Sequence, residues 1–235
     1  MNFSIQKEFL KEHSEYLGRR NYYSIDENGK IIKKDINFAL ILSAYSDNWE
    51  DTKEKINREF IWKDEKKKIR MPERMTEISV EQLKKKFIKT VLNGDEVFSL
   101  KYGYELFLRD FTEFKRVTLF FSLINQKCLF MPLYAASFFK MVKNGEKDDF
   151  KILFLFIDLL TLFPKDFSGY EESLSSNEYI EFKNCEGIKK NGALIALDML
   201  KEIGHPLLSE IENSLSKRKW KECENKKELS GIKLI

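Results

Sequence analysis

The chain has 235 residues, of which 43% are hydrophobic and 34% charged, and its formal net charge is +3. This length fits one large domain or two small ones, and 20 Phe against 10 Gly and 4 Pro disfavour a many-stranded β-sandwich and favour long helices. A charge this close to balance is unusual for a dedicated nucleic-acid binder, and two histidines cannot supply a histidine-rich metal site.

The N-terminal third combines helical stretches with one hairpin pattern. Tyr22–Ile25 and Lys30–Lys33 flank Asp26–Gly29, and Asn-Gly between apolar runs is a hairpin signal, although an ordered loop fits equally well. Lys63–Arg74 is the most polar segment and is expected to form a surface loop. Three helices are expected around these segments: Asn2–Leu17, Ile36–Ser46 and Trp49–Trp62.

Two helices are predicted next. Ser79 with Gln82 matches a capping box, and the helix that starts there should end at Asn93-Gly94. Asp95 and the acid after it suit the positive end of a helix dipole, and the following apolar pattern reads as a single helix that continues to about Ile124.

The stretch from Val117 to Phe163 is the strongest signal for a buried core. It is very apolar and contains the expected helices Cys128–Val142 and Phe150–Phe163, joined by the polar turn Lys143–Asp149. Apolar residues surround the axis of the second of these helices on nearly every side, which is typical of a central buried helix.

The C-terminal part is expected to contain a polar, acidic connection, Lys165–Lys183, with room for one helical turn. Two helices should follow, Gly187–Ile203 and Leu207–Trp220, separated by Gly204-His205-Pro206. Asn-Gly pairs recur along the chain, which is compatible with a stack of helical hairpins, while an irregular bundle needs no repeat. The recurring glycines are Gly94, Gly145 and Gly192.

Nothing in the chain predicts secretion or membrane insertion. The N-terminus has no basic start followed by an apolar run, so a secretory signal is not expected. Asp158 and Lys140 interrupt the longest apolar runs, which fall short of the about 18 apolar residues that a membrane span needs. A cytoplasmic protein is expected, with three reduced thiols: Cys128, Cys185 and Cys223.

Three acids interrupt apolar helices, and two explanations stay open for them. Asp110, Asp158 and Asp198 could converge on a divalent metal ion, or each could be structural, paired with a base such as Arg109 or Arg116 or set at a surface edge. The chain has no Glu-x-x-His motif, no glycine-rich phosphate loop and no local nucleophile motif. We therefore expect no catalytic, cofactor or metal site.

Two surface features point to macromolecular partners. Basic residues with aromatic neighbours at 63–89 and 217–221 make a nucleic-acid-associated helical protein the alternative hypothesis. Acids interleaved with aromatics after the buried helix favour a docking patch for a basic protein. The patch comprises Asp166, Tyr170, Glu171, Glu172, Glu178, Tyr179 and Glu181.

Three features follow one another between Asp95 and Leu208. An Arg-Asp step, Arg109-Asp110, precedes an apolar helix; that helix ends in a Gly-acidic turn, Lys143-Asn144-Gly145-Glu146; and a later helix lies between Gly187 and Gly204. This order resembles that of all-α immunity proteins of bacterial polymorphic toxins. The resemblance implies a cytosolic, non-enzymatic protein that binds one cognate toxin and blocks its active site.

Together these patterns predict one all-α domain over residues 1–235, built as an irregular helical bundle or as stacked helical hairpins. Residues 1–75 would hold the N-terminal helices with the hairpin or loop, 76–220 the helical core, and 221–235 a loose tail. The expected function is neutralisation of a protein partner, with no membrane contact.

Overall fold

The computed structural model describes residues 23–25, 31–33, 75–129, 131–142, 150–175, 182, 188–218 and 220. For the two strands and for residues 151, 155, 188, 189 and 191 only the backbone is described. The predicted helices within 1–62, the loop 63–74, the turn 143–149 and the tail 221–235 lie outside these residues.

A short antiparallel hairpin forms where the Asn-Gly pattern predicts one. Strand β1 (Tyr23–Ile25) pairs with β2 (Ile31–Lys33), and Ser24 lies opposite Ile32 at the centre of the register. The two strands pair as the hairpin prediction expects, and the turn between them lies outside the described residues.

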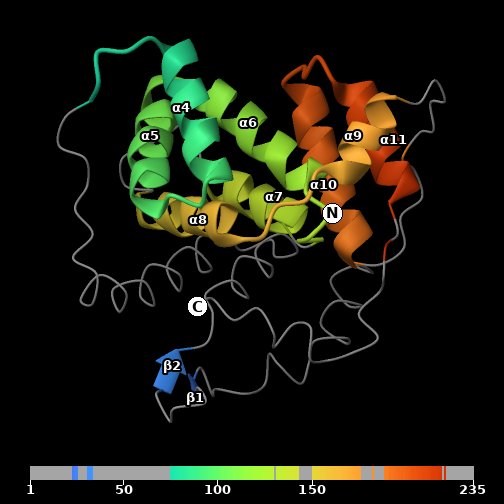
Figure 1. The fold of residues 1–235 in the computed structure, drawn as a ribbon, viewed down its shortest axis with the longest axis horizontal. Coiled ribbons are helices and arrows are strands. Elements are labelled where there is room, and N and C mark those ends of the chain that lie inside the picture. The colour runs from blue at the N-terminus through green and yellow to red at the C-terminus, as the bar shows by residue number, and fades with distance from the viewer. Residues whose placement is uncertain are drawn as a thin grey trace.

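From residue 75 onward, every regular element that the structure describes is an α-helix, which confirms the all-α prediction. Figure 1 shows α6 and α7 in the middle, with α4, α5 and α8 on one side and α9, α10 and α11 on the other. The helices are α4 (Val80–Leu92), α5 (Glu96–Arg109), α6 (Phe111–Ile124), α7 (Met131–Met141), α8 (Phe150–Leu162), α9 (Ser168–Leu174), α10 (Ile188–Glu202) and α11 (Leu208–Lys217).

The predicted ends of α4 are confirmed. The Oγ of Ser79 accepts a hydrogen bond from the backbone N–H of Gln82 at 3.3 Å, which satisfies one of the free donors of the first turn. Gly94 follows the helix with a φ of +70°, a left-handed conformation that glycine adopts without steric cost.

The single helix predicted from Asp95 to Ile124 is wrong, because the chain breaks at Asp110. This residue has φ −150° and ψ 84°, and it ends α5 and begins α6 at once. Its Oδ1 accepts a hydrogen bond from the backbone N–H of Glu113 at 2.9 Å. An Asp followed three residues later by Glu is an N-cap pattern, and here it outweighs the continuous apolar run.

Two further boundaries refine the prediction. The acidic connection 165–183 contains α9, seven residues long, rather than a single turn. Gly192 lies within α10, so the recurring Asn-Gly pairs do not mark a repeated turn. A Cβ on Gly192 would lie 2.7 Å from the Cβ of Leu133, so the glycine permits close contact between α10 and α7.

Aromatic rings hold the core together, and Phe114 of α6 lies at their centre. Phe114 is fully buried, and its ring centroid lies between 5.4 and 6.5 Å from five other phenylalanine rings. Because those rings belong to α4, α5, α7 and α8, one side chain joins five helices. The five partners are Phe87, Phe107, Phe138, Phe139 and Phe156.

The burial predicted for the apolar helix 150–163 is confirmed, although α8 lies to one side of α6 and α7 rather than at the centre. In α8 every side chain that the structure describes up to Thr161 is buried, including Asp158. Phe156 stacks on Phe138 of α7 with ring centroids 4.3 Å apart and an interplanar angle of 10°. An apolar surface around most of the helix is thereby removed from water.

Truncation of the central ring should loosen the whole core. Phe114→Ala should lower the free energy of unfolding by about 3–5 kcal/mol, because it leaves a cavity between four neighbouring helices. Phe98→Ala, at a ring that is 46% exposed, should cost on the order of 1 kcal/mol. Urea denaturation followed by circular dichroism measures both. Equal losses would contradict the central role of Phe114.

Candidate functional site

The inner side of α9 is fixed to the rest of the bundle. Tyr170 is buried, and its ring meets the edge of Phe120 of α6 at 5.4 Å. The Oγ of Ser173 donates to the carbonyl of Tyr170 at 2.7 Å and to that of Glu210 in α11 at 3.3 Å. Phe167 packs against Phe121 at 5.9 Å. These contacts compensate for the small number of hydrogen bonds within so short a helix.

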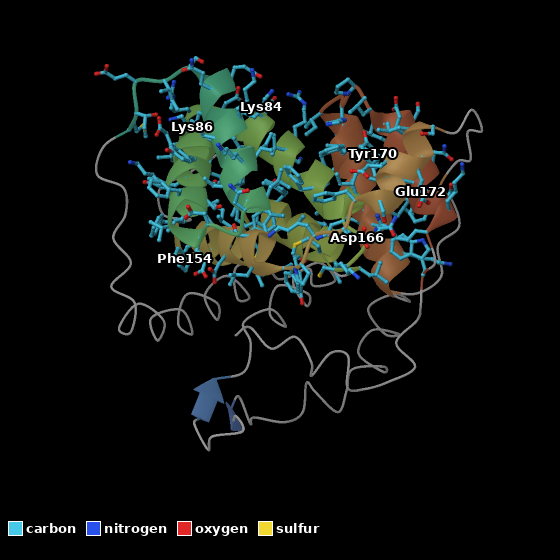
Figure 2. The ribbon with its side chains drawn as sticks, viewed as in Figure 1. Lys84, Lys86, Phe154, Asp166, Tyr170 and Glu172 are labelled. Atoms are coloured by element: carbon cyan, nitrogen blue, oxygen red, sulfur yellow. The ribbon has the colours of Figure 1, made fainter. Side chains whose placement is uncertain are left out.

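The outer side of α9 presents acids and an exposed leucine. Glu171 and Glu172 are exposed, and Leu174 is 54% exposed. Leu174 follows Ser173, which reaches the first turn of α11, and Leu207, 37% exposed, immediately precedes that turn. We call the following residues the α9 surface: Asp166, Glu171, Glu172, Leu174 and Leu207. Figure 2 labels two of them, Asp166 and Glu172, together with the buried Tyr170.

Asn125, at the end of α6, fastens the segment that leads into α9. Its Nδ2 donates to the carbonyl of Pro164 at 3.0 Å, and its Oδ1 accepts from the backbone N–H groups of Asp166 and Lys127, both at 3.1 Å. The backbone N–H of Gln126 donates to the carbonyl of Asp166 at 2.8 Å. Three of these hydrogen bonds join the end of α6 to residues 164–166 and so fix the start of the α9 surface.

The carboxylate of Asp166 is kept ionised. Its Oδ1 accepts from the Oγ and the backbone N–H of Ser168 at 2.7 and 3.1 Å. The Ser168 hydrogen bonds, with the positive charges of Lys127 and Arg218, hold the pKa of Asp166 below its usual value. At neutral pH, Asp166 thus adds a negative charge at the start of the α9 surface.

The predicted docking patch is only partly described. Asp166, Glu171 and Glu172 lie on the α9 surface, while Tyr170 faces inward as an anchor. Sequence reasoning missed Leu174, Leu207 and Asn125. The available signals were a leucine within a polar segment and another directly after a proline. Three predicted patch residues lie outside the described residues: Glu178, Tyr179 and Glu181.

The basic cluster 217–221 contains a buried rather than an exposed arginine. Arg218 is 8% exposed, its Nη2 donates to the carbonyl of Leu123 at 2.5 Å, and its guanidinium lies 5.2 Å from the centre of the Trp220 ring. Burial lowers the pKa of Arg218 to about 10. Phe182 covers the same Trp220 ring at 5.7 Å. This buried arginine is not placed to offer its charge to a phosphate at the surface.

In the part of the cluster 63–89 that the structure describes, several lysines already have partners. Lys84 pairs with Glu81 at 2.8 Å and with Glu113 at 3.1 Å. Lys85 lies 3.7 Å from Glu81, and Lys86 lies over the Tyr102 ring at 5.5 Å.

The three interrupting aspartates do not converge. Asp110 caps α6, Asp158 is buried in α8, and Asp198 is exposed on α10. No group of three or more His, Cys, Asp or Glu in the described part of the chain is placed to hold a metal ion. The pairing predicted for them with arginines is wrong for Arg109 and Arg116, which pair instead with acids of their own helices.

Glu105 of α5 is the buried acid that takes the Arg109 partner. It accepts from the backbone N–H and Oγ1 of Thr76 at 3.0 and 2.7 Å and from Arg109 at 2.8 Å. Burial alone would raise the pKa of Glu105, but the hydrogen bonds from Thr76 and Arg109 lower it. The Glu105 carboxylate therefore joins α5 to the segment that leads into α4.

His205 joins the α10–α11 turn to α6. Its ring stacks on Phe120 at 5.1 Å, and its Nδ1 accepts a hydrogen bond from the backbone N–H of Leu207 at 3.1 Å. Burial, assisted by the charge of Arg116, lowers the pKa of His205, against the opposing effect of Glu113 and Glu210. The neutral ring is therefore the form that supports the Leu207 side of the α9 surface.

No protein-family model, curated protein or solved structure matches this chain. The resemblance to immunity proteins therefore remains a prediction that depends on short motifs. None of the helices in the described part of the chain is long and apolar enough to cross a membrane.

Loss of the Asp110 cap should weaken the start of α6. Asp110→Ala should lower the free energy of unfolding by about 1 kcal/mol, because the Glu113 N–H loses its acceptor. Asp110→Asn keeps an acceptor oxygen and should lose much less, as should Asp198→Ala at an exposed position. If the Asn variant were as unstable as the Ala variant, the negative charge rather than the cap would matter.

Acid should destabilise the turn that His205 supports. Because the folded-state pKa is depressed, the contribution of His205 is complete above its unfolded pKa of about 6.5 and is lost as the pH falls through the folded value. The free energy of unfolding should therefore decline in this range. His205→Asn should flatten that decline. Urea titrations of the wild type and the variant across the range would refute this if the two declined equally.

Proposed function

We propose that this chain is a binding protein that recognises a basic protein partner through the α9 surface. The observation that carries the proposal is the combination, on one short helix, of exposed acids and an exposed leucine with an inner face fixed by Tyr170 and Ser173. Exposed apolar side chains among charges of one sign suit a protein interface, since the leucines supply buried area and the acids steer the partner.

Preorganisation supports this proposal. The Asn125 hydrogen bonds and the Ser168 contacts fix Asp166 before any partner arrives, so this carboxylate loses little conformational entropy on binding. An acidic surface can cover a basic active-site rim without undergoing chemistry of its own.

The partner class comes from the sequence resemblance. In this proposal the chain is a cytoplasmic immunity protein, and the partner is a toxin whose active site it occludes. The nucleic-acid alternative has less support from the described residues, because Arg218 is buried and Lys84 is paired with two acids. A phosphate backbone needs cations that are free to replace counterions.

Charge reversal on α9 tests the proposal. The natural choice of toxin is the product of the gene adjacent to the one that encodes this chain, purified as an inactive variant. Glu171→Lys with Glu172→Lys should weaken binding roughly tenfold or more, because attraction becomes repulsion at the contact. In a bacterial host that expresses the active toxin, the wild-type chain should restore growth and the double variant should restore it less.

Glu77→Lys with Asp198→Lys is the matched control, since both acids are exposed outside α9 and the net charge changes equally. Calorimetry measures the affinities, and circular dichroism checks that helicity is unchanged. Equal affinity of the α9 variant and the control would refute the α9 surface. A neighbouring product that is neither toxic nor bound would refute the immunity function.

A further inference from the structure

The turn between α4 and α5 carries a second exposed apolar region, far from α9. Leu92, Val97 and Phe98 are 44%, 74% and 46% exposed. They are three of the six large hydrophobic side chains that are exposed in the described part of the chain, and they lie within seven positions of one another. Clustered exposed apolar side chains usually mark an interaction site.

Lysines border this region on the α4 side. The ring of Phe98 stacks on that of Tyr102 at 6.0 Å, and Lys86 lies over the same Tyr102 ring. Lys85 and Lys89 are exposed on α4. We call the following residues the α4–α5 ledge: Lys85, Lys86, Lys89, Leu92, Val97, Phe98 and Tyr102.

Two lysines of the ledge, Lys86 and Lys89, form no ion pair with an acid in the described part of the chain, so they can meet carboxylates of a partner. Glu81 pairs with Lys84 and Lys85, and Asp95 caps α5 by accepting from the backbone N–H of Phe98 at 3.1 Å. The turn is held by Gly94 in its left-handed conformation and by the bond from the Asp95 N–H to the carbonyl of Thr90 at 3.0 Å. The ledge is therefore a preformed surface.

The ledge and the α9 surface are complementary and lie at opposite ends of the bundle. One offers lysines around apolar rings, and the other offers carboxylates around two leucines. Figure 2 shows Lys84 and Lys86 on the α4 side and Tyr170 and Glu172 on the α9 side. Because α4 and α9 lie at opposite ends of the bundle, the two surfaces of one copy do not meet within the same molecule.

We propose that the α4–α5 ledge binds the α9 surface of a second copy, so that chains associate head to tail. The inference rests on the proposed role of α9 as a docking surface, and it adds a competitor for that surface. The contact is heterologous, with different patches on the two copies, and it leaves a free ledge at one end and a free α9 surface at the other. Binding of the toxin to an α9 surface that is engaged in this contact must then displace the ledge of the neighbouring copy.

The experiment uses the full chain and needs no other molecule. Sedimentation velocity at several protein concentrations should show reversible association that declines as salt is added, because charges of opposite sign are screened. Lys85→Glu with Lys86→Glu should abolish it, as should Glu171→Lys with Glu172→Lys. Phe98→Ala should weaken it roughly tenfold, while Met75→Ser, exposed outside both surfaces, should leave it unchanged.

Complementary variants make the test specific. A mixture of the ledge variant and the α9 variant should associate, and so should one chain that carries all four reversals, because each restores opposite charges across the contact. A monomeric wild type, or reversals that do not rescue each other, would overturn the inference. So would capture of a single-stranded oligonucleotide by the ledge without self-association.

The two proposals fail separately. If the wild type is monomeric and the α9 variant still loses the toxin, only the head-to-tail contact is wrong. If reversal on α9 abolishes self-association but leaves toxin affinity unchanged, the proposed function is wrong and the contact between copies stands.

Discussion

The architecture depends on a shared aromatic contact at Phe114. Rings from α4, α5, α7 and α8 converge on this one side chain of α6, and all but Phe139 are fully buried. Since α6 also packs against α10 and α11, displacement of its axis would be felt at both ends of the bundle. The geometry of α9 is thus inherited from the core, because Phe120 and Asn125, which anchor it, lie on or just after the same helix.

The break at Asp110 is what allows α6 to take this central place. A straight helix from Glu96 to Ile124 would be one long rod, and its two halves could not pack against each other. The cap at Asp110 turns the chain, so that α5 lies against α6 as well as against α4 and α8. One carboxylate, that of Asp110, therefore fixes the point at which the chain turns from α5 into α6.

The sequence allowed the helical class and most boundaries to be predicted, because caps and turn residues act locally. Ser79, Gly94 and the apolar circumference of α8 are examples in which local chemistry and the tertiary fold agree. It did not reveal the burial of Arg218 or the side chain bridge of Asn125, since their partners are distant in the chain. For the candidate site, the acids could be predicted from the sequence. The exposure of Leu174 and Leu207 could not, because it depends on how α9 packs against α11.

A helix of only seven residues cannot persist in water by itself, because nucleation consumes most of the hydrogen-bond energy that it could gain. The proposed recognition through α9 would therefore become available only after α6 and α11 have assembled beneath it. In an incompletely folded copy the glutamates would lie on an unfolded segment, without the helical arrangement that the proposed partner recognises. Only fully folded copies would then bind the partner tightly.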